Sequence, residues 1–145
     1  MSRLPSFFLV VIALLTLGVS STSHAEQKQT LGDWDVHYMV VNTTFLSPEV
    51  AREYGIVRSK FNALVNISVL DSETQAAQRV SVTGNARNLL GNSKALTFRR
   101  VNEGDAVYYL APISFSDRET FRFSINIQLG NNTQTLQFQQ EMFVE

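Results

Sequence analysis

His37 is the residue whose chemistry is easiest to name, because no other histidine follows residue 25. In an extended strand, Asp35 and Met39 share a face with His37, so a carboxylate, an imidazole and a thioether lie in a row. Copper in its softer oxidation state accepts imidazole and thioether ligands. Same-face neighbours are about 7 Å apart, so all three reach one ion only across a bulge. Copper or other metal handling through His37 and Met39 is therefore an alternative hypothesis, and we expect no resident cofactor.

Two pairs of acids, Asp33 with Asp35 and Asp117 with Glu119, are spaced closely enough to resemble the carboxylate pair of a glycosidase. Acids in turns more often accept hydrogen bonds from nearby backbone N–H groups. Serine catalysis needs a histidine base, and the sequence contains no Gly-x-Ser-x-Gly elbow. An envelope hydrolase that uses paired acids is a second alternative. We expect a protein that is not an enzyme, with no catalytic residue and no metal ligand set.

The first 25 residues predict a cleavable secretory signal peptide. Arg3 gives a positive start, residues 7–19 form an apolar run, and Ser23-His24-Ala25 has small residues at both ends of a cleavage signal. The run is shorter than the ~20 residues that span a bilayer. We therefore expect a periplasmic protein with no membrane insertion after the signal is removed, and residues 26–145 forming one domain.

The sequence contains no cysteine and has a formal net charge of −1. Disulfides, thiol catalysis and thiolate metal sites are excluded, so packing alone must stabilise the exported domain. The basic pair Arg99-Arg100 is followed closely by Glu103 and Asp105, and no basic stripe indicates a nucleic-acid partner.

Alternation of apolar and polar residues with period two is the main structural signal. In residues 121–129, for example, Phe121, Phe123, Ile125, Ile127 and Leu129 share one face. Polar connections at 102–105 and 130–132 predict hairpins, and residues 71–78 predict a connection between a third pair. About seven strands result, near residues 34–40, 64–69, 80–87, 95–101, 106–113, 121–129 and 133–144. This number and spacing predict an all-β fold, a two-layer sandwich of the immunoglobulin or fibronectin type.

Residues 47–55 interrupt the alternation and predict a helix of about two turns between the first two strands. Ser47 can cap it, Pro48 suits the first helical position, and Gly55 can end it. Because so short a helix is unstable alone in water, Val50 and Tyr54 should hold it against the sandwich.

Several segments carry a resemblance to a known family. They are Val36-His37-Tyr38, Phe45-Leu46-Ser47-Pro48-Glu49-Val50-Ala51, Tyr54-Gly55-Ile56-Val57-Arg58-Ser59-Lys60, Leu64-Val65-Asn66-Ile67-Ser68-Val69 and Ala106-Val107-Tyr108-Tyr109-Leu110-Ala111. Over nearly the whole mature chain, the sequence resembles the exported bacterial family known as domain of unknown function 4426. That resemblance implies a small periplasmic protein of Gram-negative bacteria and no particular activity.

Residues 45–60 are the preferred contact surface, because binding residues concentrate on ordered loops of rigid scaffolds. Arg52, Arg58 and Lys60 lie on or just after the expected helix, beside apolar residues. The alternative is that this segment only caps the sandwich and that its charges are solvated. The sequence thus predicts a non-enzymatic binding or accessory module with a protein partner in the cell envelope.

Overall fold

The structure is a computed structural model that describes residues 27–145, so the predicted signal peptide over residues 1–25 lies outside the described residues. The described residues form nine strands, a 3₁₀ turn and an α-helix. In chain order they are β1 (Gln27–Leu31), β2 (Trp34–Asn42), η1 (Thr43–Phe45), α2 (Pro48–Glu53), β3 (Asn62–Asp71), β4 (Ser81–Asn88), β5 (Ser93–Leu96), β6 (Arg99–Glu103), β7 (Ala106–Ser114), β8 (Thr120–Leu129) and β9 (Asn132–Glu141).

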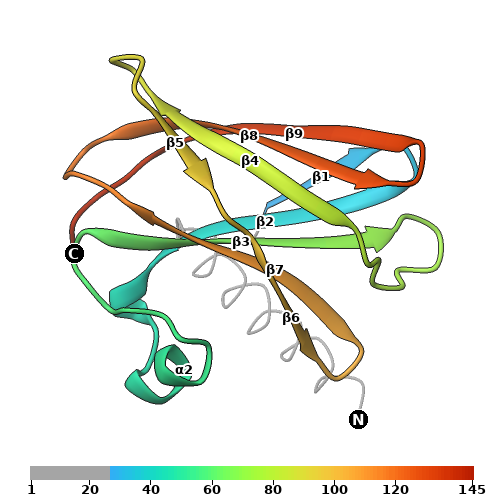
Figure 1. Cartoon of the computed structure of the whole chain (residues 1–145), viewed down its shortest axis with the longest axis horizontal. Coiled ribbons are helices and arrows are strands. Elements are labelled where there is room, and N and C mark those ends of the chain that lie inside the picture. The colour runs from blue at the N-terminus through green and yellow to red at the C-terminus, as the bar shows by residue number, and fades with distance from the viewer. Residues whose placement is uncertain (1–26) are drawn as a thin grey trace, which may run out of the picture.

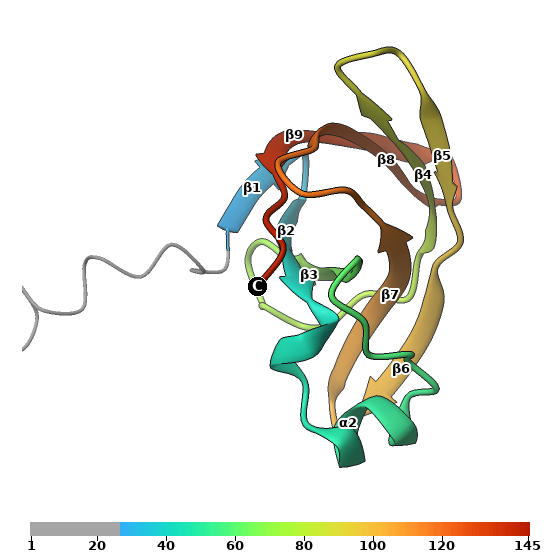
Figure 2. The same cartoon turned by 90° about the vertical axis from the view of Figure 1, so that its left-hand side faces the viewer.

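The strands make two antiparallel sheets that face each other (Figure 1). One sheet has five strands in the order β1-β2-β3-β7-β6, and the other has four in the order β5-β4-β8-β9. Figure 2 shows the two layers, with α2 below the five-stranded sheet on the side away from the other sheet. The all-β, two-layer prediction is confirmed, and the assignment to the immunoglobulin type stays a prediction.

The prediction of seven strands is wrong, because the described residues contain nine. Strand β1 is polar and has no alternation, yet it pairs with β2 along its whole length, from Gln27 opposite Tyr38 to Leu31 opposite Trp34. The strand expected over residues 95–101 is divided into β5 and β6, which lie in different sheets. Phe98, in the link, packs against the core as the chain crosses from one sheet to the other.

The two expected hairpins are confirmed, but the expected third pair of strands does not form. Gly104 and Gly130 adopt positive φ angles of 60° and 59° in the β6–β7 and β8–β9 turns, a conformation that glycine takes without strain. The connection over residues 71–78 does not join paired strands, because β3 belongs to the five-stranded sheet and β4 to the other. It instead carries the chain between the sheets.

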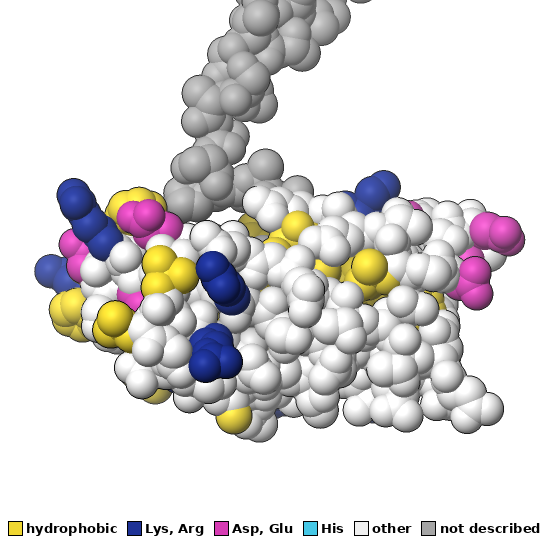
Figure 3. Space-filling model, turned by 90° about the horizontal axis from the view of Figure 1, so that it is seen from above, with side chains coloured by type: hydrophobic (Ala, Val, Ile, Leu, Met, Phe, Trp, Pro, Cys, Tyr) yellow, Lys and Arg dark blue, Asp and Glu magenta, His cyan; other side chains and the backbone are white. Residues whose placement is uncertain are grey.

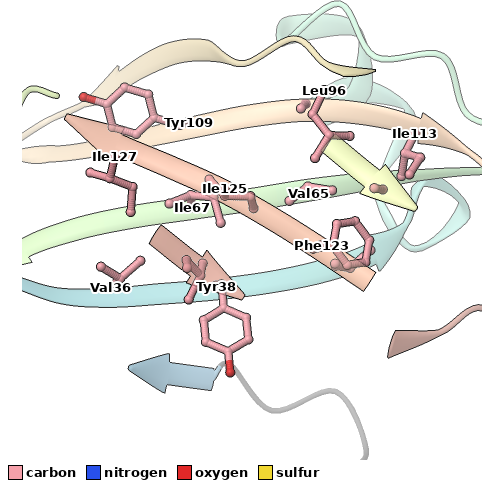
Figure 4. Close-up of a cluster of buried hydrophobic side chains, with 14 of the residues drawn as sticks. Val36, Tyr38, Val65, Ile67, Leu96, Tyr109, Ile113, Phe123, Ile125 and Ile127 are labelled. Carbon is pink, nitrogen blue, oxygen red and sulfur yellow. The ribbon is translucent and has the colours of Figure 1, made fainter. Parts of the chain in front are cut away.

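The core fills the space between the sheets, because alternate residues of facing strands point inward (Figure 4). Val36, Val65 and Ile67 come from one sheet and Ile125 and Ile127 from the other, and each is 0% exposed. Full burial of such a side chain contributes roughly 1.5–3 kcal/mol. The inward face expected for residues 121–129 is confirmed as far as Ile127. Leu129 is the exception, since it lies in the last position before the turn and is 47% exposed.

The predicted helix is present as α2, within the segment of residues 43–61 that joins β2 to β3. The Ser47 hydroxyl accepts a hydrogen bond from the Val50 N–H at 3.2 Å, Pro48 opens the helix, and Gly55 follows it with φ of 66°. Both ends of the segment are joined by Thr43, which is 0% exposed and accepts a hydrogen bond from the Ser59 N–H. The 43–61 segment is therefore an ordered part of the fold.

Candidate functional site

The outer face of the five-stranded sheet is hollowed where the 43–61 segment folds back across it. The hollow has a volume of about 520 Å³, and we call it the outer-face pocket. Its size falls within the range of pockets that bind small molecules. Its lining residues are His37, Met39, Leu46, Val50, Tyr54, Ile56, Leu64, Asn66, Ser68, Leu70, Val101, Glu103, Tyr108 and Leu110.

The floor of the outer-face pocket is set by strand register. Met39 of β2 lies opposite Asn66 of β3, which in turn lies opposite Leu110 of β7. His37 lies opposite Ser68 in the neighbouring row. The floor therefore alternates apolar and polar side chains, and the His37 Nε2 and Asn66 Oδ1 atoms are both buried.

Asn66 is unusual because its buried Oδ1 atom accepts no hydrogen bond from the described residues. The register explains this, since its cross-strand neighbours Met39 and Leu110 have no N–H or O–H in their side chains. A buried polar atom without a partner costs free energy, so such atoms are uncommon in folded proteins.

The roof of the pocket is α2 and the residues after it. Ala51 is 3% exposed and packs inward, whereas Val50 lines the pocket and is 38% exposed. The Tyr54 hydroxyl donates a hydrogen bond to Glu103 at 2.9 Å, and Arg99 donates to the Tyr54 carbonyl. The prediction that Tyr54 holds the helix in place is confirmed, but Ala51 rather than Val50 is the buried residue. The hydrogen bond to Glu103 raises the pKa of Tyr54.

Of the three residues considered as copper ligands, His37 and Met39 line the pocket and Asp35 does not. The Asp35 carboxylate accepts hydrogen bonds from Gln75 Nε2 at 2.9 Å and from Thr30 Oγ1 at 2.8 Å. It also forms an ion pair with Lys28, whose Nζ atom lies 3.9 Å from Asp35 Oδ2. These hydrogen bonds, with Gln75 the larger cause, lower the pKa of Asp35. Within residues 27–145, no group of three or more His, Cys, Asp or Glu residues is placed to hold a metal ion.

The acids considered for hydrolysis have structural contacts. Asp117 accepts a hydrogen bond from the Val144 N–H at 2.9 Å, and Glu119 accepts from Asn88 Nδ2 and the Ser116 N–H. Glu103 is the one acid among the residues that line the outer-face pocket. The two expected acid pairs therefore do not converge on this pocket.

The three basic residues of the predicted contact surface differ in their surroundings. Arg52 on α2 and Lys60 before β3 are exposed. The Arg58 guanidinium donates a hydrogen bond to the Thr44 carbonyl at 3.1 Å, so it links the two ends of the 43–61 segment. Arg58 thus has a structural contact as well as an exposed position.

Four of the segments that connect or follow the strands lie at one end of the molecule. Because Asn42 pairs with Ala63, Asn88 with Phe121, and Thr120 with Glu141, four segments emerge at the same end of the two sheets. These segments are residues 43–61, 89–92, 115–119 and 142–145, and together we call them the loop end.

Exposed large apolar side chains are concentrated in the four segments of the loop end, which reach from α2 at the bottom of Figure 2 to the β4–β5 turn at its top. Of the eight large apolar side chains exposed in the described part of the chain, seven belong to these segments, and Leu129 lies at the opposite end. The seven are Phe45, Val50, Val57, Phe61, Leu89, Leu90 and Phe143. Figure 3 shows apolar and charged side chains crowded at the left of the molecule, while the broad face of the four-stranded sheet is mostly white.

Sequence reasoning found His37, Met39 and the 43–61 segment but missed that they meet in one pocket. It also missed Asn66 and Ser68 as pocket residues. A signal was available, because Leu64 and Leu70 make the outward face of β3 apolar at both ends. An apolar outward face on a central strand indicates that another segment covers it.

No helix in residues 27–145 has the length and apolar composition required to cross a bilayer. No curated protein matches the sequence significantly. Among solved structures, a DUF4426 family protein from Pseudomonas aeruginosa is 41% identical, with a TM-score of 0.73, and the match covers 83% of this chain and 96% of that one.

More distant structures share the fold alone. FetP from a uropathogenic Escherichia coli strain, expressed in the periplasm, is 10% identical with a TM-score of 0.59, covering 83% of this chain and 95% of that one. A copper-bound variant of FetP is 13% identical with a TM-score of 0.55, covering 81% and 89%. The family model described as domain of unknown function (DUF4426) matches residues 28–145. With the whole described domain matched in this way, the chain belongs to the DUF4426 family.

Proposed function

We propose that this protein is a non-enzymatic binding module of the periplasm that docks a protein partner through its loop end. One observation carries the proposal, namely that seven of the eight exposed large apolar side chains lie there. Single apolar side chains are common on protein surfaces, but a concentration of them is typical of an interaction site.

The composition of the loop end favours a protein as the partner. Phe45, Phe61 and Phe143 are aromatic and about half exposed, and Arg52 and Arg58 are on the same group of segments. Aromatic residues and arginine are the side chains that protein interfaces use most, often as the residues with the largest binding energy. Basic and acidic residues are mixed on α2, where Glu49 and Glu53 flank Arg52. This mixture does not favour a strongly anionic surface such as nucleic acid.

Two further findings support a periplasmic location. The apolar run and cleavage signal in residues 1–25 are typical of export. FetP, whose fold is similar, was recombinantly expressed in the periplasm of E. coli. We also propose that the sandwich is of the immunoglobulin type, which presents loops for binding at the ends of its sheets.

The docking proposal is tested by site-specific photocrosslinking in cells. A photoreactive phenylalanine analogue replaces Phe61, Leu90 or Phe143, one at a time, and Leu129 as the matched control at the opposite end. We expect one adduct of the same size from all three loop-end positions and none from Leu129. Adducts from Leu129 of equal yield would contradict a directional docking surface.

The basic residues are tested in the same cells. Reversal of Arg52, Arg58 and Lys60 to glutamate should reduce the adduct yield from Leu90 by tenfold or more, because unlike charges guide the docking of protein surfaces. Reversal of Arg79, outside the loop end, is the control. Unchanged yield in the triple variant would remove these three residues from the contact surface.

Copper handling is a second candidate, and it is favoured by the presence of His37 and Met39 in one pocket. The copper-bound form of FetP supports it through similarity of fold. A titration of Cu(I) against a coloured chelator, without oxygen, tests it. Under this candidate the protein removes one equivalent of copper from the chelator, and His37→Ala and Met39→Leu abolish the removal. Failure of the unaltered protein to compete with a weak chelator would end this candidate.

A further inference from the structure

The outer-face pocket shares the 43–61 segment with the loop end, but its floor on the five-stranded sheet has a chemistry of its own. Its volume of about 520 Å³ lies between the five-stranded sheet and α2 and is partly open to solvent. Leu64 and Leu110 in its walls are 5% and 8% exposed, although they lie on the outward face of the sheet. The 43–61 segment above them therefore shields both side chains from solvent.

The polar atoms of the pocket define what would complete it. Asn66 Oδ1 is buried and accepts no hydrogen bond from the described residues, and Met39 and Leu110 on either side of it cannot supply one. A molecule in the pocket that brings an N–H or O–H group would satisfy this oxygen. Such a hydrogen bond should add more binding free energy than one to an exposed acceptor, because the folded protein already carries the cost of burying the Asn66 oxygen without a partner.

The charges of the pocket restrict the occupant further. Its lining contains no lysine or arginine, and its one acid is Glu103, which already accepts a hydrogen bond from Tyr54. An anionic molecule would lose its hydration without gaining a lysine or arginine partner. Eight of the lining residues are apolar, namely Met39, Leu46, Val50, Ile56, Leu64, Leu70, Val101 and Leu110.

We propose that the outer-face pocket binds an uncharged, largely apolar small molecule that donates one hydrogen bond to Asn66 Oδ1. The apolar body lies over Leu64, Met39 and Leu110, and the donor reaches the middle of the floor. This site does not depend on the docking of a protein at the loop end, and the two can succeed or fail separately.

Three naphthalene compounds separate the elements of the proposal. 1-Naphthol has the ring and an O–H donor, naphthalene has the ring alone, and 1-naphthoate replaces the donor with a negative charge. Each is titrated into isotope-labelled protein, and binding is followed by the NMR shifts of the Met39, Asn66 and Leu110 amides. We expect 1-naphthol to bind about tenfold more tightly than naphthalene, the effect of one hydrogen bond to a buried acceptor, and 1-naphthoate to bind most weakly.

The matched variants are Asn66→Leu and Asn126→Leu. Asn66→Leu removes the acceptor at similar volume and should reduce the affinity for 1-naphthol to that for naphthalene. Asn126→Leu makes the same change on the outer face of the other sheet, where Asn126 accepts a hydrogen bond from Thr135, and should change neither affinity. Ser68→Phe, which fills the pocket, should abolish binding of all three compounds.

Three results would overturn the proposal. Equal affinity of the unaltered protein for 1-naphthol and naphthalene would remove the role of Asn66. Tightest binding of 1-naphthoate would contradict an uncharged occupant. Absence of shifts at the three amides would mean that the pocket is not a ligand site. Reversal of the charges of Arg52 and Lys60, which are exposed and do not line the pocket, should leave all three affinities unchanged, so this experiment is separate from the test of docking.

Discussion

Thr43 shows how one buried hydroxyl can hold a long segment in place. The Thr43 Oγ1 atom accepts a hydrogen bond from the Ser59 N–H at 2.9 Å. The same hydroxyl is within donor distance of two carbonyl oxygens, that of Ser59 at 3.0 Å and that of Asn62 at 3.1 Å. Both ends of the 43–61 segment therefore meet at this side chain. The position of α2 over the sheet, and with it the outer-face pocket, depends on this contact.

Thr43→Val keeps the shape of the side chain but removes the hydroxyl. We expect the free energy of unfolding to fall by about 1–3 kcal/mol, because the Ser59 N–H loses its buried partner. Urea denaturation of the variant measures this change. Thr135→Val is the control, since Thr135 is exposed and its hydrogen bond to Asn126 can be replaced by water; it should cost at most about 0.5 kcal/mol. Equal costs for the two variants would show that Thr43 does not anchor the segment.

Asp35 makes a pH-dependent contribution to stability. Its pKa is lowered by hydrogen bonds from Gln75 and Thr30, so the folded state favours its ionised form. A group with a lowered folded pKa contributes stability above its unfolded pKa, near 3.8, and loses that contribution as the pH falls through the folded value. Asp35→Asn should therefore be less stable than the unaltered protein at pH 7, and the difference should shrink below about pH 4.

Urea denaturation at a series of pH values measures the Asp35 effect. Asp105→Asn is the control for the loss of a surface charge, because Asp105 lies exposed in the β6–β7 turn. A difference for Asp35→Asn that stays constant from pH 7 to pH 3 would assign the effect to packing instead of ionisation.

At the scale of elements, β4 and β8 approach each other closely at Gly84. A Cβ atom at this position would lie 2.7 Å from the Ser124 carbonyl oxygen and 3.0 Å from Ile125 Cγ1. Gly84 lies opposite Ile125 in the register, so the two strands would have to move apart to admit a side chain. The glycine is thus required by space and not by its φ angle.

Gly84→Ala should lower the free energy of unfolding by about 1–3 kcal/mol, the usual cost of overpacking. Gly104→Ala is the comparison, because a Cβ atom at Gly104 meets nothing within 4 Å and only its φ of 60° is unfavourable. That change should cost about 1 kcal/mol, the lower end of the penalty for a left-handed residue that has a Cβ atom. Thermal or urea unfolding ranks the two, and a smaller cost at Gly84 than at Gly104 would contradict the close contact of β4 with β8.

Elements with strong local signals could be predicted from the sequence, and those set by distant contacts could not. The alternation over residues 121–127 predicts β8 because it is buried on one face, and Ser47, Pro48 and Gly55 predict α2 through capping chemistry. Strand β1 has no such pattern, since its pairing with β2 supplies its structure. The division of β5 from β6 was also missed, because period-two alternation does not report which sheet a strand joins.

In the candidate site, too, local sequence signals could be read but contacts between distant residues could not. The outward position of His37 and Met39 follows from alternation, and the contact chemistry of residues 45–60 follows from their types. Their meeting in one pocket depends on how the 43–61 segment folds back, and on the pairing of Asn66 with Met39 and Leu110. These are contacts between residues far apart in the sequence, so no local pattern encodes them.

At the scale of the whole molecule, the structure divides into a rigid body and a set of loops supported by it. The two sheets share one core, to which both contribute side chains that are 0% exposed, such as Ile67 and Ile125. The loop end carries apolar side chains that contribute little to this core, since Leu90 is 87% exposed and Leu89 is 62% exposed. Their backbone is nevertheless fixed, because Asn88 Oδ1 accepts hydrogen bonds from the Leu90 and Asn92 N–H groups.

This division predicts that changes at the two places separate stability from binding. Ile125→Val should lower the free energy of unfolding by about 0.5–1.5 kcal/mol in one cooperative transition, because the sheets unfold together when their shared core is weakened. Leu89→Ser with Leu90→Ser should change it by no more than about 0.5 kcal/mol, since neither side chain is buried. Urea denaturation followed by circular dichroism and by Trp34 fluorescence measures both. Two separate unfolding transitions for Ile125→Val would show that the two sheets unfold independently. A large loss of stability in the double leucine variant would show that Leu89 and Leu90 stabilise the fold and are not reserved for a partner.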